Sequence, residues 1–238
     1  MRWRLAGIAI LVAVLLAYLV RPVILAEMRW RDIQRRGVLR IGIDPGRQPF
    51  SYYTAQGWQG SDAELAKVLG QRLNLSIQSD PVGYDAMADA LQIGRTDIGL
   101  SALVADPTRT EDLAYTHSYF DAGPRLLTGQ SVAGFEDLAN QRVAVMLGSD
   151  ADRLLRFWVR RVPGLQAVTF SSDAVGVAAL ESQQVNAALV DVLALPKDAN
   201  TRWHVLSPQP RPYVIAVRRD NTRLLQELNR ALDETKKR

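Results

Sequence analysis

The chain has 238 residues and is 47% hydrophobic, a content typical of a globular protein with one large domain or two small lobes. It has no cysteine, which excludes disulfides, thiolate nucleophiles, cysteine-ligated zinc and a lipid-modified N-terminal cysteine, and its two histidines leave little material for a histidine metal site or a catalytic triad. The net charge of +4 is concentrated in residues 1–40, where eight arginines stand against two acidic residues, so the remaining body lacks the basic excess of a nucleic-acid binder.

The first predicted element is an apolar segment, residues 5–20, preceded by the basic sequence MRWR. A positive flank followed by an apolar run fits a signal peptide or an uncleaved signal anchor. Its sixteen residues are short for a membrane span of about 20 residues, although the following PVILA can extend it. Because no good small-x-small cleavage site follows, we expect an uncleaved transmembrane helix over residues 1–26. The rest of the chain is then exported to the periplasm or the cell surface.

A short polar helical connector, residues 27–36, precedes a regular alternation of strands and helices. The patterns of this first lobe, residues 37–122, predict in chain order a strand at 38–44, a helix at 61–73 with a capping box of Ser61 and Glu64, a strand at 75–79, a helix at 84–94 and a strand at 97–104. Asp106 and Pro107 then predict a helix start, with Asp106 as the N-cap.

The alternation restarts in residues 123–208, which we expect to form a second lobe. Its predicted strands are 124–129, 142–146, 167–170, 187–191 and 202–206, and its predicted helices are 136–141, 172–184 and one that Ser149 caps. Residues 209–238, with a last strand and helix, return to the first lobe. This order predicts an α/β fold with parallel-rich sheets, in which ligands bind beyond the carboxyl ends of the strands.

Polar side chains at these strand ends form the candidate ligand site. They are Asp44, Tyr84, Asp85, Arg109, Ser149, Asp150 and Asp191. Arg109 falls inside a predicted first helical turn, where the helix dipole favours an anion over a cation, so we expect it to bind one. Arg109 facing Asp191 across a cleft suits a zwitterion, because the guanidinium binds a carboxylate bidentately and the aspartate accepts from an ammonium. The alternatives are helix caps for the aspartates, a core position for Tyr84 and a solvated surface position for Arg109.

Four motifs follow one another in the first lobe: GVLRIGIDPGRQPF, GSDAEL, ALQIGRTD and TRTEDLAYTHSY. With them the chain resembles, from about Gly37 to Arg230, the family 3 solute-binding proteins of bacterial polar amino-acid ABC transporters. The resemblance implies a two-lobed, periplasmic-binding-protein-like (type II) flytrap that is crossed twice by the chain and holds its ligand between the lobes. It also implies an ABC permease as partner and a monomeric body.

Four candidate residues match ligand-binding positions of the family that the chain resembles. Arg109 matches the arginine that pairs with the ligand α-carboxylate, and Asp191 matches the aspartate that receives the α-ammonium. Tyr84 falls on the aromatic position over the ligand side chain, and Asp44 falls on an acidic position near the ligand.

Three positions depart from the family pattern. Val104 replaces a serine or threonine, Arg47 replaces an aromatic or apolar residue, and Asp150 replaces a threonine or serine that assists the arginine. A second anion within about 4 Å of a ligand carboxylate costs on the order of several kcal/mol unless it is paired or protonated. We therefore expect Arg47 to supply that pairing to Asp150 from the opposite lobe.

The residues and the resemblance together predict a non-catalytic, extracytoplasmic protein that captures an amino acid or a similar small polar metabolite. A membrane permease would recognise the closed form. Two alternatives stay open, a membrane-anchored sensing or accessory domain and an enzyme that resembles cyclohexadienyl dehydratases, with a second-lobe carboxylate as general acid. Because no nucleophile–base arrangement is visible, we expect no catalytic residue, no metal and no cofactor.

Overall fold

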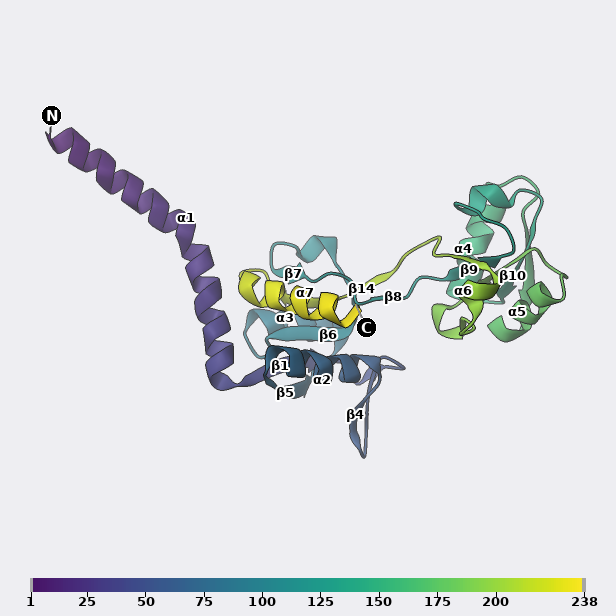
Figure 1. Cartoon of the computed structure of the whole chain (residues 1–238), viewed down its shortest axis with the longest axis horizontal. Helices are drawn as coiled ribbons and strands as arrows, with labels where there is room; N and C mark the ends of the chain where they lie inside the picture. The colour runs from purple at the N-terminus through teal and green to yellow at the C-terminus, as the bar shows by residue number, and fades with distance from the viewer. Residues whose placement is uncertain (1, 237–238) are drawn as a thin grey trace. The chain divides into compact units, whose positions relative to one another are not determined.

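The structure of the protein is a computed structural model that describes residues 2–236, with side chains described for residues 18–235. It divides the chain into two compact units, which we call lobe 1 (Met1–Tyr119 and Tyr213–Arg238) and lobe 2 (Phe120–Pro212). Each lobe has its own sheet with helices packed against it, as Figure 1 shows. The expected α/β class with two lobes is therefore confirmed.

The main sheet of lobe 1 has the order β5-β1-β6-β14-β7, with β8 paired to β14. Its strands are β1 (Val38–Ile43), β5 (Ser76–Pro81), β6 (Ile98–Val104), β7 (Leu113–Tyr115) and β14 (Pro212–Arg218), and β8 is Phe120–Asp121, where the chain passes into lobe 2. Its helices are α2 (Ser61–Leu73), α3 (Met87–Gln92), α7 (Thr222–Lys236) and the 3-10 turns η1 (Tyr84–Ala86) and η2 (Pro107–Arg109). Because β1 is parallel to both β5 and β6, these three strands end at one edge of the sheet.

The core of lobe 1 forms where the apolar faces of α2 and α7 cover this sheet. Leu39 and Ile41 of β1 are fully buried with Leu69 of α2 and Leu228 of α7. Helix α3 covers the opposite face, where its Met87 is buried with Leu103 of β6. The near-continuous apolar sequence of β1 and β6 follows, because a parallel strand covered on both faces carries no polar side. The lobe therefore holds the carboxyl ends of β1, β5 and β6 in fixed positions.

A small second sheet in lobe 1 was not predicted from the sequence. It consists of β2 (Gly46–Arg47), β3 (Ser51–Thr54) and β4 (Gly57–Gln59), in the order β2-β3-β4. These strands have two to four residues each, too few to show a clear alternation of apolar and polar positions. The sheet matters for the site because it carries Arg47.

The capping box expected at Ser61 and Glu64 is not formed. The N-cap of α2 is Gly60, and no side chain caps this helix end. Gly60 has φ 104°, and a Cβ atom there would lie 2.3 Å from the carbonyl oxygen of Phe50, so the N-cap position takes only glycine. Glu64 instead accepts an ion-pair contact of 2.7 Å from Lys67.

Helix α1 runs from Arg2 to Arg36, and its C-terminal part belongs to lobe 1. Trp30 and Ile33 are buried in the core that also contains β1 and α7. Ion pairs join the helix to α7 and the turn before it, between Glu27 and Arg223 at 3.5 Å and between Arg29 and Asp220. The segment 27–36, expected as a connector, is therefore a continuation of α1 that packs on the lobe.

The expected membrane-spanning helix over residues 1–26 is not supported. Within the part of the chain that the structure describes, no helix has the length and apolar character needed to cross a membrane. Arg21 and Glu27 interrupt the apolar run in the described half of α1. The side chains of residues 2–17, which hold most of the predicted segment, lie outside the described residues.

Lobe 2 is built on a sheet with the order β11-β10-β12-β9-β13. Its strands are β9 (Arg125–Thr128), β10 (Arg142–Met146), β11 (Gln166–Phe170), β12 (Ala187–Val190) and β13 (His204–Leu206). Its helices are α4 (Asp150–Val159), α5 (Asp173–Glu181), α6 (Ala199–Arg202) and the 3-10 turns η3 (Phe135–Leu138) and η4 (Val192–Ala194). Strand β10 is parallel to β11 and β12, so these strands also end at one edge.

Candidate functional site

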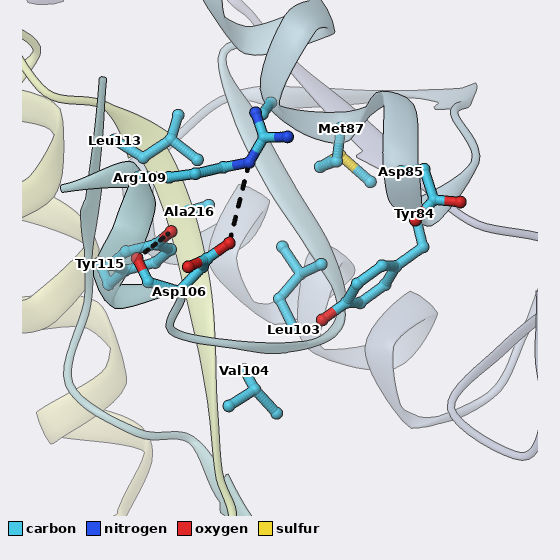
Figure 2. A pocket seen from close by; sticks show the side chains of 11 residues that line it. Tyr84, Asp85, Met87, Leu103, Val104, Asp106, Arg109, Leu113, Tyr115 and Ala216 are labelled. Atoms are coloured by element: carbon cyan, nitrogen blue, oxygen red, sulfur yellow. Dashed lines mark hydrogen bonds and ion pairs between the residues drawn. The ribbon is translucent and has the colours of Figure 1, made fainter. Parts of the chain in front are cut away.

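Lobe 1 contains a pocket of about 190 Å³ at the edge where β5 and β6 end (Figure 2). Small-molecule pockets for drug-sized ligands usually measure about 300–1,000 Å³, so this one suits a ligand of few atoms. Apolar side chains from α3, β6 and β7 form part of its wall. Its polar lining residues are Tyr84, Asp85, Asp106, Arg109 and Tyr115.

Arg109 is the cationic residue of this lining. It is the last residue of η2, a single 3-10 turn that Asp106 caps by accepting from the backbone N–H of Thr108 at 2.8 Å. The predicted cap is thus confirmed, but the argument from a helix dipole was wrong, because one turn sums too few peptide dipoles. The Nε atom of Arg109 lies 3.8 Å from Asp106, and Figure 2 shows the guanidinium extending into the pocket. Its two terminal nitrogens have no partner among the described residues.

Tyr84 lines the same pocket, and Asp44 holds it in place. Asp44 follows β1, and its two carboxylate oxygens accept from the backbone N–H groups of Gly46 at 2.8 Å and of Tyr84 at 3.0 Å. The hydroxyl of Ser51 donates to the carbonyl of Asp44 at 2.7 Å. The geometry therefore gives Asp44 a positioning role: it is not part of the pocket lining, and both of its carboxylate oxygens are already engaged.

Arg47 lies against Tyr84 within lobe 1. Its guanidinium carbon is 4.6 Å from the centre of the Tyr84 ring, and its Nη2 donates to the carbonyl of Ala102 at 3.3 Å. Cation–π contacts of this kind are favourable within about 6 Å. The expected pairing of Arg47 with Asp150 would join the two lobes and stays a prediction, while the partners of Arg47 within lobe 1 are Tyr84 and Ala102.

A cluster of hydrogen bonds that was not predicted from the sequence lies next in the chain to two lining residues of the pocket. Ala102 of β6 has φ 48°, in the left-handed region, and directly precedes Leu103 and Val104 of the lining. Its backbone N–H donates to Asp62 at 2.8 Å and to the hydroxyl of Tyr119 at 3.2 Å. That hydroxyl in turn donates to the second oxygen of Asp62 at 2.9 Å. The cluster fixes a backbone conformation that alanine alone rarely adopts.

Burial governs the titration of this cluster. Asp62 is fully buried, and burial raises the pKa of its carboxyl although Tyr119, Ala102 and Arg47 act in the opposite direction. Burial also raises the pKa of Tyr119, and the nearby Asp62 raises it further. Both residues occur in the quoted motifs, Asp62 in GSDAEL and Tyr119 at the end of TRTEDLAYTHSY. The motifs mark the residues, but only the packing shows that they meet.

The candidate residues of lobe 2 lie at the edge where its parallel strands end. Ser149 accepts from the backbone N–H of Asp152 at 3.0 Å, so the predicted cap of α4 is confirmed. Asp150, the first residue of α4, pairs with Arg211 at 3.3 Å and also with Arg153. The second anion that the sequence placed near a ligand carboxylate is therefore balanced within lobe 2.

Asp191 follows β12 and is the N-cap of η4. Its carboxylate accepts from the backbone N–H of Leu193 at 2.8 Å, and its own N–H donates to the buried Asp173 at 3.2 Å. The residue is exposed, so its carboxylate can accept a further hydrogen bond. Asp191 is therefore a helix cap, and its carboxylate can still accept a hydrogen bond from a ligand.

Three polar lining residues received no ligand role from the sequence: Asp85, a strand-end residue beside Tyr84, Asp106, predicted as a helix cap, and Tyr115. Asp85 lines the pocket beside Tyr84 and has no hydrogen-bond or ion-pair partner among the described residues. Tyr115 lines the opposite wall, and its hydroxyl donates to the carbonyl of Asp106 at 3.4 Å. The position of Asp85 next to Tyr84 was the available signal, whereas nothing local marks Tyr115.

The pocket combines one guanidinium, carboxylates and aromatic rings. It has no serine, threonine, cysteine, histidine or lysine in its lining, and so no nucleophile paired with a base. No group of metal-ligating side chains occurs among the residues that the structure describes. The arrangement is therefore suited to holding a small zwitterion by charge and ring contacts.

The chain matches one protein family and is similar to a known binding protein. Residues 39–238 match the model of the bacterial extracellular solute-binding proteins, family 3. The L-cystine-binding protein TcyJ of Escherichia coli (strain K12) is 26% identical over 215 residues, which cover 86% of this chain and 80% of the relative.

Two solved structures are similar to the chain. An ancestral cationic amino acid solute binding protein is 28% identical with a TM-score of 0.56, over 88% of this chain and 94% of that one. An ancestral cyclohexadienyl dehydratase is 21% identical with a TM-score of 0.66, over 88% and 91% of the two chains. At that identity the second likeness shows the fold alone.

Proposed function

Since this chain belongs to the bacterial extracellular solute-binding proteins of family 3, we propose that it is a non-catalytic protein that captures an amino acid or a similar small polar metabolite outside the cytoplasm. The observation that carries the proposal is Arg109, whose terminal nitrogens extend into a small pocket without a partner among the described residues. The partner that receives the ligand is the permease of an ABC transporter.

The roles of the residues follow from their chemistry. The guanidinium of Arg109 binds the ligand carboxylate through two parallel hydrogen bonds, which a planar fork forms and a lysine ammonium does not. Tyr84 covers the apolar part of the ligand. The ammonium is received by a carboxylate, Asp85 in the pocket or Asp191 of lobe 2, each with acceptor capacity to spare. Closure of lobe 2 over ligand bound to lobe 1 would produce the form that the permease recognises.

The test is a thermal-shift screen of the full-length protein against the twenty amino acids, common polyamines and small dicarboxylates. A ligand present at 100 times its dissociation constant adds about 2.7 kcal/mol to the free energy of unfolding, which raises Tm by roughly 5–10 °C for a chain of this size. We expect a selective shift that Arg109→Ala abolishes. The matched control is Arg95→Ala, an exposed arginine of lobe 1 that donates to the carbonyl of Pro81 at 3.2 Å.

A full shift retained in Arg109→Ala would contradict the proposed site, and a cooperative melt with no shift for any compound would contradict the proposed function. The alternative as a dehydratase is tested on the same sample with prephenate and arogenate. Turnover of either compound would make the protein an enzyme, with Asp85 and Asp106 as the carboxylates that line its pocket.

A further inference from the structure

We propose that the pocket of lobe 1 selects an acidic amino acid, one with a second carboxylate in its side chain, and that Arg47 is the residue that selects it. The inference rests on the proposed function, because it names the ligand class of the same site. It is carried by the two guanidinium groups near Tyr84 and by the carboxylates around them.

The two arginines have more hydrogen-bond donors than the lobe uses. A guanidinium has five N–H donors. Arg47 uses one of them, toward the carbonyl of Ala102, and the contact of its plane with the Tyr84 ring uses none. Arg109 has its Nε at 3.8 Å from Asp106 and no further partner among the described residues. Most of the donors on both groups are therefore available to a ligand.

The neighbouring carboxylates are already engaged. Both oxygens of Asp44 accept from backbone N–H groups. Oδ1 of Asp106 accepts from the backbone N–H and, at 2.6 Å, from the hydroxyl of Thr108, and its Oδ2 faces Nε of Arg109 at 3.8 Å. Asp62 is fully buried and holds Tyr119 and Ala102. These carboxylates lower the local positive charge but leave the free guanidinium donors without acceptors.

Asp85 is different, because it lines the pocket and has no partner among the described residues. Arg109 in the lining, together with Arg47 outside the lining but beside the ring of Tyr84, thus offers two sets of guanidinium donors next to one carboxylate without a partner. An amino acid with an acidic side chain has the matching groups, two carboxylates and one ammonium. Arg109 takes one carboxylate, Arg47 takes the other, and Asp85 takes the ammonium.

A cationic side chain fits the same site poorly. The ring of Tyr84 already carries a cation on one face, the guanidinium of Arg47 at 4.6 Å from its centre. A ligand guanidinium or ammonium at this ring would either lie beside a like charge or displace Arg47 from it. At 28% identity, the likeness to the ancestral cationic amino acid solute binding protein leaves this position free to differ.

Isothermal titration of the full-length protein with L-glutamate, L-aspartate, L-glutamine, L-arginine and L-histidine tests the inference. We expect the tighter of the two acidic amino acids to bind about 100-fold more tightly than L-arginine. L-glutamine, which has the shape of glutamate without its charge, should bind about 10-fold more weakly than L-glutamate.

The variant that isolates the charge is Arg47→Gln, whose amide can still donate to the carbonyl of Ala102. It should reduce the preference for L-glutamate over L-glutamine by about 10-fold while L-glutamine affinity changes little. Arg47→Ala repeats the test without the amide, and Arg95→Ala is the matched control that should leave every affinity unchanged. A melting curve for each variant identifies any that does not fold.

The outcomes separate this inference from the proposed function. Tighter binding of L-arginine or L-histidine than of the acidic amino acids, abolished by Arg109→Ala, would overturn the inference and leave the proposed function standing. An unchanged glutamate-to-glutamine ratio in both folded Arg47 variants would overturn the role of Arg47. Absence of binding for every amino acid and for every other compound of the screen, with a cooperative melt, would overturn both.

Discussion

Both lobes have polar residues where the parallel strands of their sheets end, but these residues have different roles in the two lobes. In each lobe parallel strands end at one edge, and polar side chains follow them. In lobe 1, Tyr84 and Arg109 line a pocket. In lobe 2, Ser149 and Asp191 accept hydrogen bonds from backbone N–H groups two or three residues ahead of them.

The difference comes from what each side chain can accept. A serine or aspartate at a strand end can satisfy the backbone N–H groups of the turn that follows, and in lobe 2 it does so. An arginine has no acceptor and cannot cap, so Arg109 extends beyond its own turn. Asp150 of lobe 2 is charged but is balanced by Arg211 and Arg153. We therefore expect most of the ligand-binding free energy to come from lobe 1.

The largest expected effect is on ligand affinity, which should depend on an arginine of lobe 1 and not on one of lobe 2. Arg109→Ala should weaken ligand binding by about 100-fold or more, because truncating one partner of a hydrogen-bonded charge pair costs about 2–5 kcal/mol. Arg153→Ala, the matched change at an exposed arginine of lobe 2, should change affinity by less than about 3-fold, as surface ion pairs contribute about 0–1 kcal/mol. Isothermal titration with the ligand found in the screen measures both, and equal losses would contradict the comparison.

The next largest effect is expected from removing one buried carboxylate in each lobe. Asp62→Ala should lower the free energy of unfolding of lobe 1 by about 3 kcal/mol, because the N–H of Ala102 and the hydroxyl of Tyr119 lose their acceptor at about 1–3 kcal/mol each. It should also weaken ligand binding, since Ala102 precedes the pocket lining. Asp152→Ala in lobe 2 removes the hydrogen bond from Gly148 at 3.0 Å and the ion pair with Arg156 at 2.8 Å, and it should lower stability alone.

Amide hydrogen exchange resolves the two changes, because it reports the protection of β1 and β6 separately from that of β10 and β12. Loss of protection in both lobes from either single substitution would contradict the assignment of each carboxylate to its own lobe. Unchanged ligand affinity in Asp62→Ala would contradict the link between the buried cluster and the pocket.

The dependence of stability on pH should have opposite signs at two carboxylates. Burial raises the pKa of Asp62 in lobe 1 above its ordinary 3.8. The folded state then holds the proton more tightly, so the stability of the protein relative to Asp62→Asn should fall as the pH rises from 3.8 through the folded pKa.

In lobe 2, burial raises the pKa of Asp121, but hydrogen bonds from Gly123, Arg211 and Ser207 outweigh burial and lower it below 3.8. Stability relative to Asp121→Asn should therefore be fully present above pH 3.8 and be lost as the pH falls through the folded pKa. Denaturant melts of the protein and both variants across this range measure the two slopes. Equal signs would show that one of the environments is assigned wrongly.

The smallest expected effect concerns the helix ends. Ser149→Ala in lobe 2 removes a side-chain cap and should cost about 1 kcal/mol of stability. Ser61→Ala in lobe 1 should stay within about 0.5 kcal/mol, because the N-cap of α2 is Gly60 and Ser61 makes no cap bond. Denaturant midpoints of the two variants give the comparison, and an equal loss would restore the capping box that the sequence predicts.

The sequence by itself determined the features that depend on near neighbours in the chain. The alternation of apolar patterns identified the α/β class, since each helix or strand buries one face at its own period. The caps at Asp106 and Ser149 were read correctly because donor and acceptor are two or three residues apart. Tyr84 and Arg109 were expected to lie close together because parallel strands end at one edge, and they line one pocket.

Only the tertiary structure decided which distant residues meet. Around Ala102, Arg47 donates to its carbonyl 55 positions away, its N–H donates to Asp62 40 positions away, and Tyr119 donates to Asp62 across 57 positions. No local pattern encodes such contacts, because they depend on how β6 bends at Ala102 and on where the small sheet with Arg47 packs. Asp150 likewise pairs with Arg211, 61 positions away in the same lobe. Ion pairs form between charged side chains that the packing of the fold brings within a few ångströms, whatever their separation in the chain.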